Sequence, residues 1–176
     1  MESLRYRLEP ALQNAGDFIA LDGVLDEHVL TLGHTSYVLP RGIAYHVELS
    51  HAGEGIVVAG TATATVTGEC ARCLEEARFE ADGQIEGYFV LEGFETPEEL
   101  AEDEFEQVEP EGEIELADLI RAAIIYELPT VLLCRDDCLG LCPRCGANLN
   151  KETCGCKDAP DDDNPFSALK GLDFSK

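Results

Sequence analysis

The sequence is poor in basic residues and contains no long apolar run. It holds 12 lysines and arginines against 36 aspartates and glutamates, which gives a formal net charge of −24 at pH 7. A chain this negative is badly suited to gripping RNA phosphates over a broad surface, so a basic macromolecular partner is the better electrostatic match. No run approaches the roughly 18 apolar residues of a membrane span, and we therefore expect no membrane contact.

The first residues also lack the pattern of a secretion signal. Residues 1–9, Met-Glu-Ser-Leu-Arg-Tyr-Arg-Leu-Glu, have no apolar segment behind a basic start. We therefore expect a cytoplasmic protein. In a reducing cytosol, clustered cysteines are more often metal thiolates than disulfides.

Motifs for nucleotide binding and for nucleophilic catalysis are missing as well. The sequence contains no Gly-x-Ser-x-Gly elbow, no phosphate-binding loop ending in Gly-Lys-Ser/Thr, and no Gly-x-Gly-x-x-Gly fingerprint. Residues 95–115 hold eleven acidic residues and no lysine or arginine, which favours a solvated loop over a binding arm for a basic partner, and favours a catalytic carboxylate pair least. The histidines lie apart from one another and from the cysteines, so we do not expect them to bind metal. They are His28, His34, His46 and His51.

Cysteine is the residue that the chain concentrates. Six of its eight cysteines fall within residues 134–156, and the other two form a Cys-x-x-Cys pair at Cys70 and Cys73. The sharpest motif is Cys142-Pro-Arg-Cys145-Gly146, in which the two-residue gap lets both sulfurs meet one ion while backbone N–H groups point at them. A glycine at position 146 can take the positive φ that such a turn needs.

Two tetrahedral zinc sites follow from this spacing. Cys154 and Cys156 complete a four-sulfur set with Cys142 and Cys145, which we name site one. The remaining four cysteines predict site two, which joins segments about 60 residues apart. Spacing leaves other pairings open, such as Cys134 and Cys138 with Cys142 and Cys145. The ligands predicted for site two are Cys70, Cys73, Cys134 and Cys138.

Four sulfurs leave no open coordination position, so both sites are expected to be structural and not catalytic. Basic residues gather in or beside the cysteine segments, where they can offset the net charge of −2 on each Zn²⁺ with four thiolates. The same residues are the sequence's candidates for local contact with RNA or protein, together with two apolar residues near the C-terminus. The candidate contact residues are Arg72, Arg144, Lys151, Phe166 and Leu169.

Alternation of apolar and polar residues predicts a sheet. Residues 4–8 alternate, and residues 44–49, 56–67 and 77–91 are alternating or β-branched with glycine-containing turns between them, as in antiparallel hairpins. Cys70 and Cys73 then fall at the tip of a hairpin. Two further short strands, at 18–21 and 29–32, are expected around a turn at Asp22-Gly23.

One amphipathic helix is predicted near residues 116–128, since its apolar residues recur at three- and four-residue intervals and Pro129 ends it. The predicted fold class is therefore α+β: a mainly antiparallel β-sheet with one packed helix and a Cys-rich, zinc-binding C-terminal segment. The expected domains are a β-rich body at 1–133, the zinc segment at 134–157, and an acidic linker with a short helix at 158–176.

The combination of these pieces resembles the YceD family of bacterial proteins. The resemblance is carried by Gly68-Glu-Cys-Ala-Arg-Cys-Leu-Glu75, the Ile-Glu-Leu-Ala-Asp-Leu-Ile helix, Cys138-Leu-Gly-Leu-Cys-Pro-Arg-Cys-Gly-Ala-Asn-Leu-Asn150, and the Asn164-Pro-Phe tail. It implies a role in accumulation of large-subunit ribosomal RNA and in biogenesis of the large subunit. The partner it implies is a ribosomal protein or pre-ribosomal particle.

The sequence leaves three functions to compare. The first is a non-enzymatic assembly factor stabilised by two Zn²⁺. The second is a redox or metal-handling protein whose cysteine pairs form an exchangeable or iron–sulfur site. The third, a metal-dependent nuclease, lacks an open metal position, a general base and a positive groove.

Overall fold

The computed structural model describes residues 3–8, 11–33, 35–94, 105–108 and 111–156. The chain divides into two compact units, Met1–Cys138 and Leu139–Lys176. The elements described, all in the first unit, are β1 (Arg5–Arg7), β2 (Phe18–Leu25), β3 (Val29–Leu32), β4 (Thr35–Val38), β5 (Ile43–His51), β6 (Gly55–Glu69), β7 (Glu76–Val90), β8 (Glu106–Gln107), β9 (Glu113–Glu115) and α1 (Ala117–Glu127).

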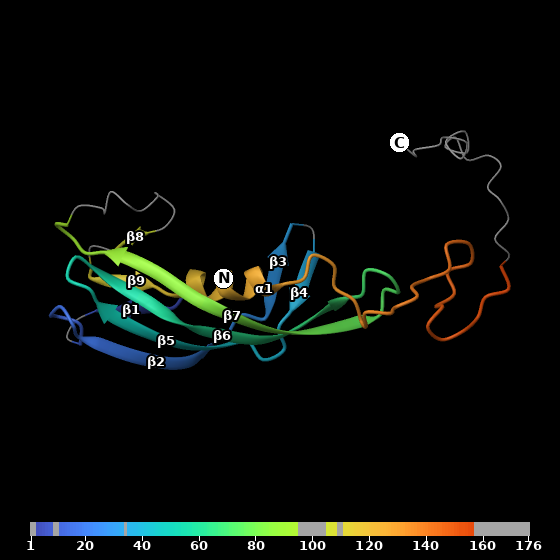
Figure 1. Cartoon of the computed structure of the whole chain (residues 1–176), viewed down its shortest axis with the longest axis horizontal. Coiled ribbons are helices and arrows are strands. Elements are labelled where there is room, and N and C mark those ends of the chain that lie inside the picture. The colour runs from blue at the N-terminus through green and yellow to red at the C-terminus, as the bar shows by residue number, and fades with distance from the viewer. Residues whose placement is uncertain (1–2, 9–10, 34, 95–104, 109–110, 157–176) are drawn as a thin grey trace, which may run out of the picture. The chain divides into compact units, whose positions relative to one another are not determined.

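The two longest strands of the sheet, β6 and β7, form a hairpin (Figure 1). The two strands pair in unbroken antiparallel register from Gly55 opposite Val90 to Glu69 opposite Glu76. β5 and β4 share the other edge of β6, and β2 and β3 lie beyond them. The predicted mainly antiparallel sheet with one helix is confirmed.

One face of this sheet is buried beneath α1. In β6, Ile56, Val58 and Ala62 are fully buried on this face, and they alternate with exposed residues because strand side chains point to opposite sides. The helix approaches β7 closely: a Cβ on Gly83 would stand 2.2 Å from the carbonyl oxygen of Ala123. Glycine at this position therefore sets the distance between helix and sheet.

The predicted turn at Asp22-Gly23 is wrong. β2 runs straight through both residues and pairs with β5 from Phe18 to Leu25. Gly23 stands opposite Tyr45, and a Cβ there would lie 2.5 Å from the phenol oxygen of Tyr45. The glycine is thus explained by a tyrosine ring lying over the strand, a pairing that local sequence does not reveal.

The acidic stretch predicted as a loop contributes structure at its C-terminal end. β9 pairs with β1, and Ile114 is buried with 1% of its surface exposed. Residues 95–104 and 109–110 of the stretch, and the helix expected after residue 158 with Phe166 and Leu169, lie outside the described residues.

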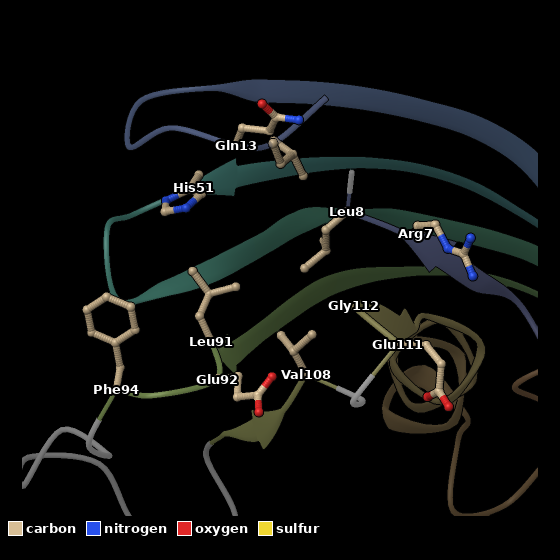
Figure 2. Close-up of a pocket in the computed structure, with 11 residues that line it drawn as sticks. Arg7, Leu8, Gln13, His51, Leu91, Glu92, Phe94, Val108, Glu111 and Gly112 are labelled. Atoms are coloured by element: carbon tan, nitrogen blue, oxygen red, sulfur yellow. The ribbon is translucent and has the colours of Figure 1, made fainter. Parts of the chain in front are cut away.

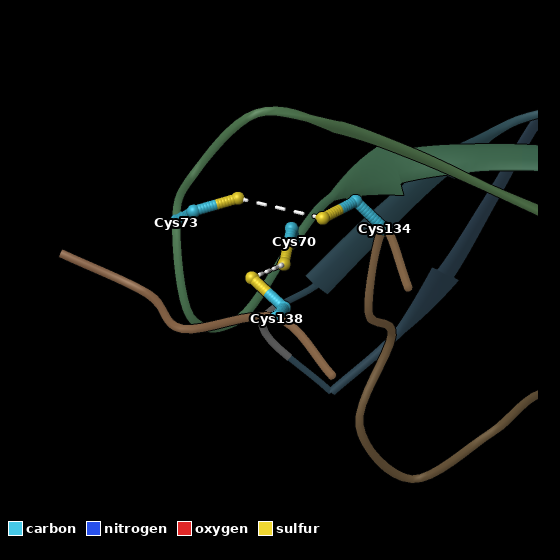
Figure 3. A group of neighbouring side chains, drawn as sticks. All are labelled: Cys70, Cys73, Cys134 and Cys138. Atoms are coloured by element: carbon cyan, nitrogen blue, oxygen red, sulfur yellow. Dashed lines mark hydrogen bonds between the residues drawn. The ribbon is translucent and has the colours of Figure 1, made fainter. Parts of the chain in front are cut away.

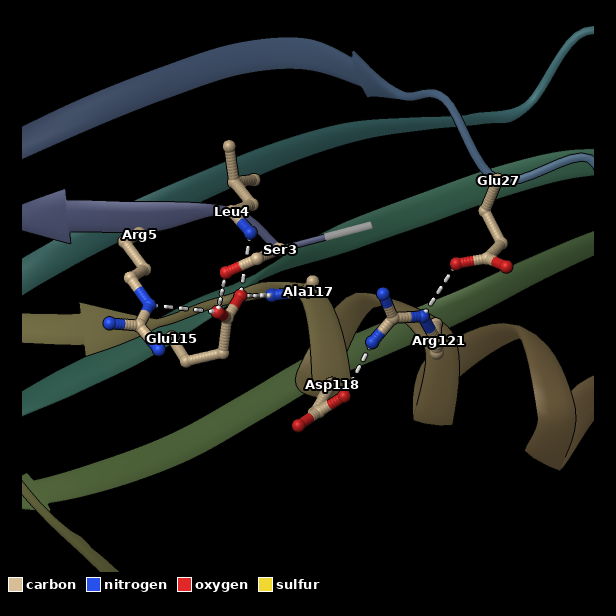
Figure 4. A network of polar contacts seen from close by, with 8 residues as sticks. All are labelled: Ser3, Leu4, Arg5, Glu27, Glu115, Ala117, Asp118 and Arg121. Carbon is tan, nitrogen blue, oxygen red and sulfur yellow. Dashed lines mark hydrogen bonds and ion pairs between the residues drawn. The ribbon is translucent and has the colours of Figure 1, made fainter. Parts of the chain in front are cut away.

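Polar contacts join β1 to the start of α1 (Figure 4). The carboxylate of Glu115 accepts hydrogen bonds from the N–H groups of Leu4 (2.7 Å) and Ala117 (3.0 Å). Further along the helix, the buried guanidinium of Arg121 lies 2.9 Å from the Glu27 carboxylate and 2.5 Å from that of Asp118. These ion pairs satisfy a charge that would otherwise be costly to bury.

Candidate metal centres

The connection between β6 and β7 forms a tight knuckle around Cys70 and Cys73. The N–H of Cys70 donates to the carbonyl of Glu75 (2.8 Å), and the N–H of Leu74 donates to the carbonyl of Cys70 (2.9 Å). Leu74 has φ of 60°, the left-handed region that leucine rarely adopts. The paired strands hold this knuckle, so its two sulfurs are positioned by the sheet.

Cys134 and Cys138 reach the same place from the segment after α1. The N–H of Ala71 donates to the carbonyl of Leu132 (2.9 Å), and the guanidinium of Arg72 donates to the carbonyl of Cys138 (2.9 Å). Figure 3 shows the four sulfurs facing one another from two separate stretches of chain.

The sulfur spacing of this first cluster matches a tetrahedral metal site. The Sγ atoms of Cys70 and Cys138 are 3.8 Å apart, those of Cys73 and Cys134 are 3.6 Å apart, and all four lie within 4.8 Å of one another. A tetrahedron with metal–sulfur bonds of about 2.3 Å has sulfur–sulfur edges of about 3.8 Å. A disulfide needs about 2.05 Å, and all eight cysteines are free thiols.

The first cluster is the predicted site two. The predicted site one is the second cluster, which lies in the second unit and repeats the same backbone knuckle. The N–H of Cys142 donates to the carbonyl of Ala147 (2.8 Å), and the N–H of Gly146 donates to the carbonyl of Cys142 (2.9 Å). Gly146 has φ of 74° and so occupies the position that Leu74 occupies in the first knuckle. The sulfurs of Cys142, Cys145, Cys154 and Cys156 again lie within 4.8 Å of one another.

The two clusters differ in exposure. In the first, Cys70, Cys73 and Cys138 are buried and Cys134 is exposed. In the second only Cys142 is buried, and both Cys145 and Cys156 are exposed. Solvent and competing ligands therefore reach the second cluster more easily.

Backbone donors make one thiol in each cluster ready to ionise. Burial works to raise the pKa of Cys70, but N–H groups of Cys134, Cys73 and Arg72 donate to its sulfur and lower the pKa to about 6. The N–H groups of Cys145 and Arg144 likewise lower the pKa of Cys142 to about 6. The intervening N–H groups thus point at the sulfur, as the two-residue spacing suggested.

The remaining thiols resist ionisation without a cation. Burial, and then the neighbouring sulfurs, raise the pKa of Cys134 to about 12. The Cys145 sulfur, followed by burial, raises the pKa of Cys156 to about 12. Four thiolates this close repel one another, so a bound divalent cation is what would let all of them exist together.

Sequence analysis did not anticipate two features of the first cluster. The Arg72 guanidinium bonds to the loop carrying Cys138, which gives that candidate contact residue a local partner. Leu74 exposes 60% of its surface beside a groove of about 620 Å³ that Val131 and Leu132 also line. Its positive φ could have been suspected only from its alignment with Gly146.

None of the described histidines belongs to either cysteine cluster. His46 pairs with Asp22 (2.7 Å), His28 pairs with Asp26 (2.9 Å), and the Nδ1 of His51 accepts from the N–H of Gly53 (3.0 Å). His34 lies outside the described residues. The described metal-compatible groups are composed of cysteine alone.

A pocket of about 910 Å³ opens at the other end of the β6–β7 hairpin (Figure 2). Its walls include Leu8, Leu91 and Phe94, and the charged Arg7 also lines it, paired with Glu113 (2.9 Å). Nothing described there forms a nucleophile–base pair or a cysteine cluster. In the described part of the chain, none of the helical segments has the length and apolarity to cross a bilayer.

Fold and site together define a β-sheet protein that carries two four-cysteine clusters of the kind that bind structural metal. A sequence profile described as Large ribosomal RNA subunit accumulation protein YceD matches residues 58–173, a stretch that includes all eight cysteines. The chain belongs to the YceD family.

The chain is also similar to several mycobacterial proteins. An uncharacterized protein of Mycobacterium tuberculosis is 41% identical over 99 residues, which is 56% of this chain and 47% of that protein. An uncharacterized protein of Mycobacterium leprae is 30% identical over 146 residues, 82% of this chain and 66% of that protein. The chain spans about half the length of several curated relatives that it matches.

A plant protein carries the family name. The chloroplastic Large ribosomal RNA subunit accumulation protein YCED homolog 1 of Arabidopsis thaliana is 41% identical over 44 residues, 25% of this chain and 14% of that protein. No solved structure matches the chain. The family description names RNA accumulation and no catalytic activity.

Proposed function

We propose that this protein is a non-enzymatic, zinc-stabilised factor that supports accumulation of large-subunit ribosomal RNA and biogenesis of the large ribosomal subunit in the cytoplasm. The observation that carries the proposal is the family match over residues 58–173, whose description names large ribosomal RNA subunit accumulation and whose span contains both cysteine clusters.

Zinc is the metal that the donor set favours. Four thiolates at tetrahedral spacing suit Zn²⁺, and they leave no position for water or substrate. One ion would hold the tip of the β6–β7 hairpin to the segment after α1. The other would close the loop around Cys142. The role proposed for the metal is therefore to stabilise surfaces that other molecules bind.

Charge favours a basic partner. With a net charge of −24, the chain as a whole repels RNA phosphates and attracts basic proteins. A ribosomal protein or a pre-ribosomal particle of the large subunit fits this requirement. RNA contact would be local, at Arg72, Arg144 or Lys151 beside the clusters, with Phe166 and Leu169 as further candidate contacts.

The test is replacement of the chromosomal gene by variants, followed by measurement of the ratio of large- to small-subunit ribosomal RNA. Cys70→Ser removes a proposed zinc ligand and should lower that ratio. Lys151→Glu should lower it if local RNA contact matters, and Arg78→Glu, which reverses an exposed charge on β7, is the control for charge reversal. A ratio unchanged in the complete deletion would end the proposal.

Tagged protein recovered from cells tests the partner separately. We expect large-subunit proteins to remain bound after nuclease treatment, because a basic protein partner does not need RNA as a bridge. Partners confined to thioredoxin-type reductases would instead support the second function below.

A redox or metal-handling role is the second candidate, and the lowered pKa of Cys142 beside the exposed Cys145 favours it. An exchangeable or iron–sulfur site at these cysteines would absorb visible light, whereas zinc thiolates are colourless. The spectrum of protein purified without oxygen separates the two functions.

A further inference from the structure

The outer edge of β2 has no neighbouring strand in the described part of the chain. β2 ends the order β2-β5-β6 of the sheet, and Figure 1 shows it along the sheet's margin. All eight of its residues pair with β5 on the inner side, in register from Phe18 opposite Ser50 to Leu25 opposite Ile43. The free edge is therefore roughly 26 Å long, since strands rise about 3.3 Å per residue.

This edge has little of the usual protection against strand addition, with Asp22 as its one charged side chain. Free edges of natural sheets are commonly blunted by lysine, by proline or by a bulge. The sequence of β2, Phe-Ile-Ala-Leu-Asp-Gly-Val-Leu, has neither residue, and its register with β5 is continuous. Phe18 and Val24 expose 68% and 61% of their surface, so the edge is also apolar.

The charge carried by β2 itself is of one sign, although Arg41 lines a groove with Val24 and the His46 imidazole pairs with Asp22. No lysine or arginine occurs between Arg7 and Arg41. Asp22 exposes 76% of its side chain on the face opposite α1, and Glu48 of β5 stands on the same face, opposite Ala20. An added strand would bring its own side chains beside Asp22, with Glu48 one strand further in, within reach of long basic side chains only.

A second copy of this chain is a poor occupant. Two chains of net charge −24 repel each other. Antiparallel pairing of β2 with itself would also bring the two Asp22 carboxylates close together, and like charges on neighbouring strands are destabilising.

We propose that the outer edge of β2 binds an extended polypeptide segment rich in lysine or arginine, which adds to the sheet as a further strand. Backbone hydrogen bonds would provide the pairing, Phe18 and Val24 would cover the segment's apolar side chains, and Asp22 and Glu48 would select its basic ones. The inference deepens the proposed function, on which it rests for the expectation of a basic assembly partner, by naming the surface that this partner uses.

The first experiment measures binding of a labelled synthetic peptide in which lysine and valine take turns along one face of the strand and threonine fills the other face, about ten residues long to match β2. Val24→Lys should weaken binding by about tenfold or more, because it places a like charge on the edge and removes apolar contact. Val29→Lys is the matched control: it makes the same substitution at a half-exposed valine of β3, and should leave affinity within about twofold.

Wild-type protein provides a second measurement that does not depend on a variant folding. The peptide should slow amide hydrogen exchange in Phe18–Leu25, and the same peptide N-methylated at alternate residues should not, since it cannot donate backbone hydrogen bonds. Equal binding by the N-methylated peptide, or protection elsewhere in the sheet alone, would overturn the proposal. So would dimerisation that Val24→Lys abolishes, or an RNA oligonucleotide that competes with the peptide.

Recovery of cellular partners distinguishes failure of this inference from failure of the proposed function. Large-subunit proteins recovered equally with wild type and Val24→Lys would overturn the β2 surface while leaving the proposed function intact. Their loss with Val24→Lys and retention with Val29→Lys would support both.

Discussion

Leu74 and Gly146 occupy the same place in two nearly identical knuckles, yet only glycine adopts that conformation without steric cost. The hydrogen bonds that close the two turns have equal lengths, 2.8 and 2.9 Å in each. Leu74 nevertheless holds φ at 60° and leaves most of its side chain exposed. Packing of the Leu74 side chain therefore offsets little of its backbone strain. The knuckle around Leu74 must be held by the paired strands and the cysteines around it.

Replacement of Leu74 should therefore separate backbone strain from side-chain contact. Relative to Leu74→Ala, Leu74→Gly should raise the free energy of unfolding by about 1 kcal/mol, since glycine removes the Cβ clash that alanine keeps. Urea denaturation followed by circular dichroism measures the difference. An alanine variant as stable as the glycine variant would show that this turn stores no strain.

Glu115 links pH to stability at the residue scale. Burial acts to raise its pKa, but hydrogen bonds from the Ser3 hydroxyl and from the N–H groups of Leu4 and Ala117, with the Arg5 charge, hold it below the ordinary 4.5. A lowered pKa in the folded state means that the carboxylate stabilises the fold above the unfolded pKa. That stability is lost as pH falls through the folded pKa.

Glu115→Gln should accordingly lower the free energy of unfolding by about 1 kcal/mol at pH 7, the scale of a helix-capping carboxylate. The difference from wild type should shrink as pH falls below 4.5. Glu113→Gln, which removes only the pair with the exposed Arg7, should cost less. Urea denaturation at several pH values makes the comparison, and a difference independent of pH would contradict it.

At the scale of elements, two glycines of β7 allow α1 to pack close to that strand. Gly83 admits the backbone of Ala123, whereas Gly87 faces the side chain of Leu119, whose Cδ1 would stand 2.6 Å from an added Cβ. A backbone carbonyl cannot move without the helix, but the end of a leucine side chain can rotate.

Gly83→Ala should therefore destabilise the protein by about 2 kcal/mol, with Gly87→Ala costing clearly less. The melting temperatures of the two variants give the order directly. The reverse order would mean that α1 shifts over β7 more freely than its packing indicates.

The sheet also explains why sequence patterns located most strands but misplaced one turn. Apolar and polar residues alternate along β5, β6 and β7 because one face of these strands is buried beneath α1. The approximate ends of the three strands could therefore be predicted. Gly23 was predicted to lie in a turn because glycine after aspartate is typical of turns. The strand partner that explains it, Tyr45, lies more than twenty residues away in the sequence. β4 was missed because Thr-Ser-Tyr-Val begins with two polar residues, whereas β3, Val-Leu-Thr-Leu, is mostly apolar.

At the scale of the whole molecule, each cysteine cluster belongs to one compact unit. Cys70, Cys73, Cys134 and Cys138 all lie in Met1–Cys138, and the other four cysteines lie in Leu139–Lys176. Loss of metal from one cluster should thus affect its own unit first.

Metal removal should proceed in two steps. Under a chelator, native mass spectrometry should show loss of one ion from the cluster with the exposed Cys145 and Cys156 before loss of the second. Cys70→Ser should lower the melting temperature of the sheet, since a structural zinc contributes roughly 10 kcal/mol or more in small peptides. Cys156→Ser is the control and should leave the sheet's transition in place; simultaneous release of both ions would contradict this order.

Elements that depend on near neighbours could be predicted from the sequence: the two Cys-x-x-Cys knuckles, the amphipathic helix and the long β6–β7 hairpin. Each follows from spacing or periodicity within a few residues. The fold was needed to show which sulfurs meet across about 60 residues, why Gly23 lies in a strand, and which strand edge has no partner among the described residues. Those outcomes depend on contacts between distant segments, where packing and charge overrule local preference.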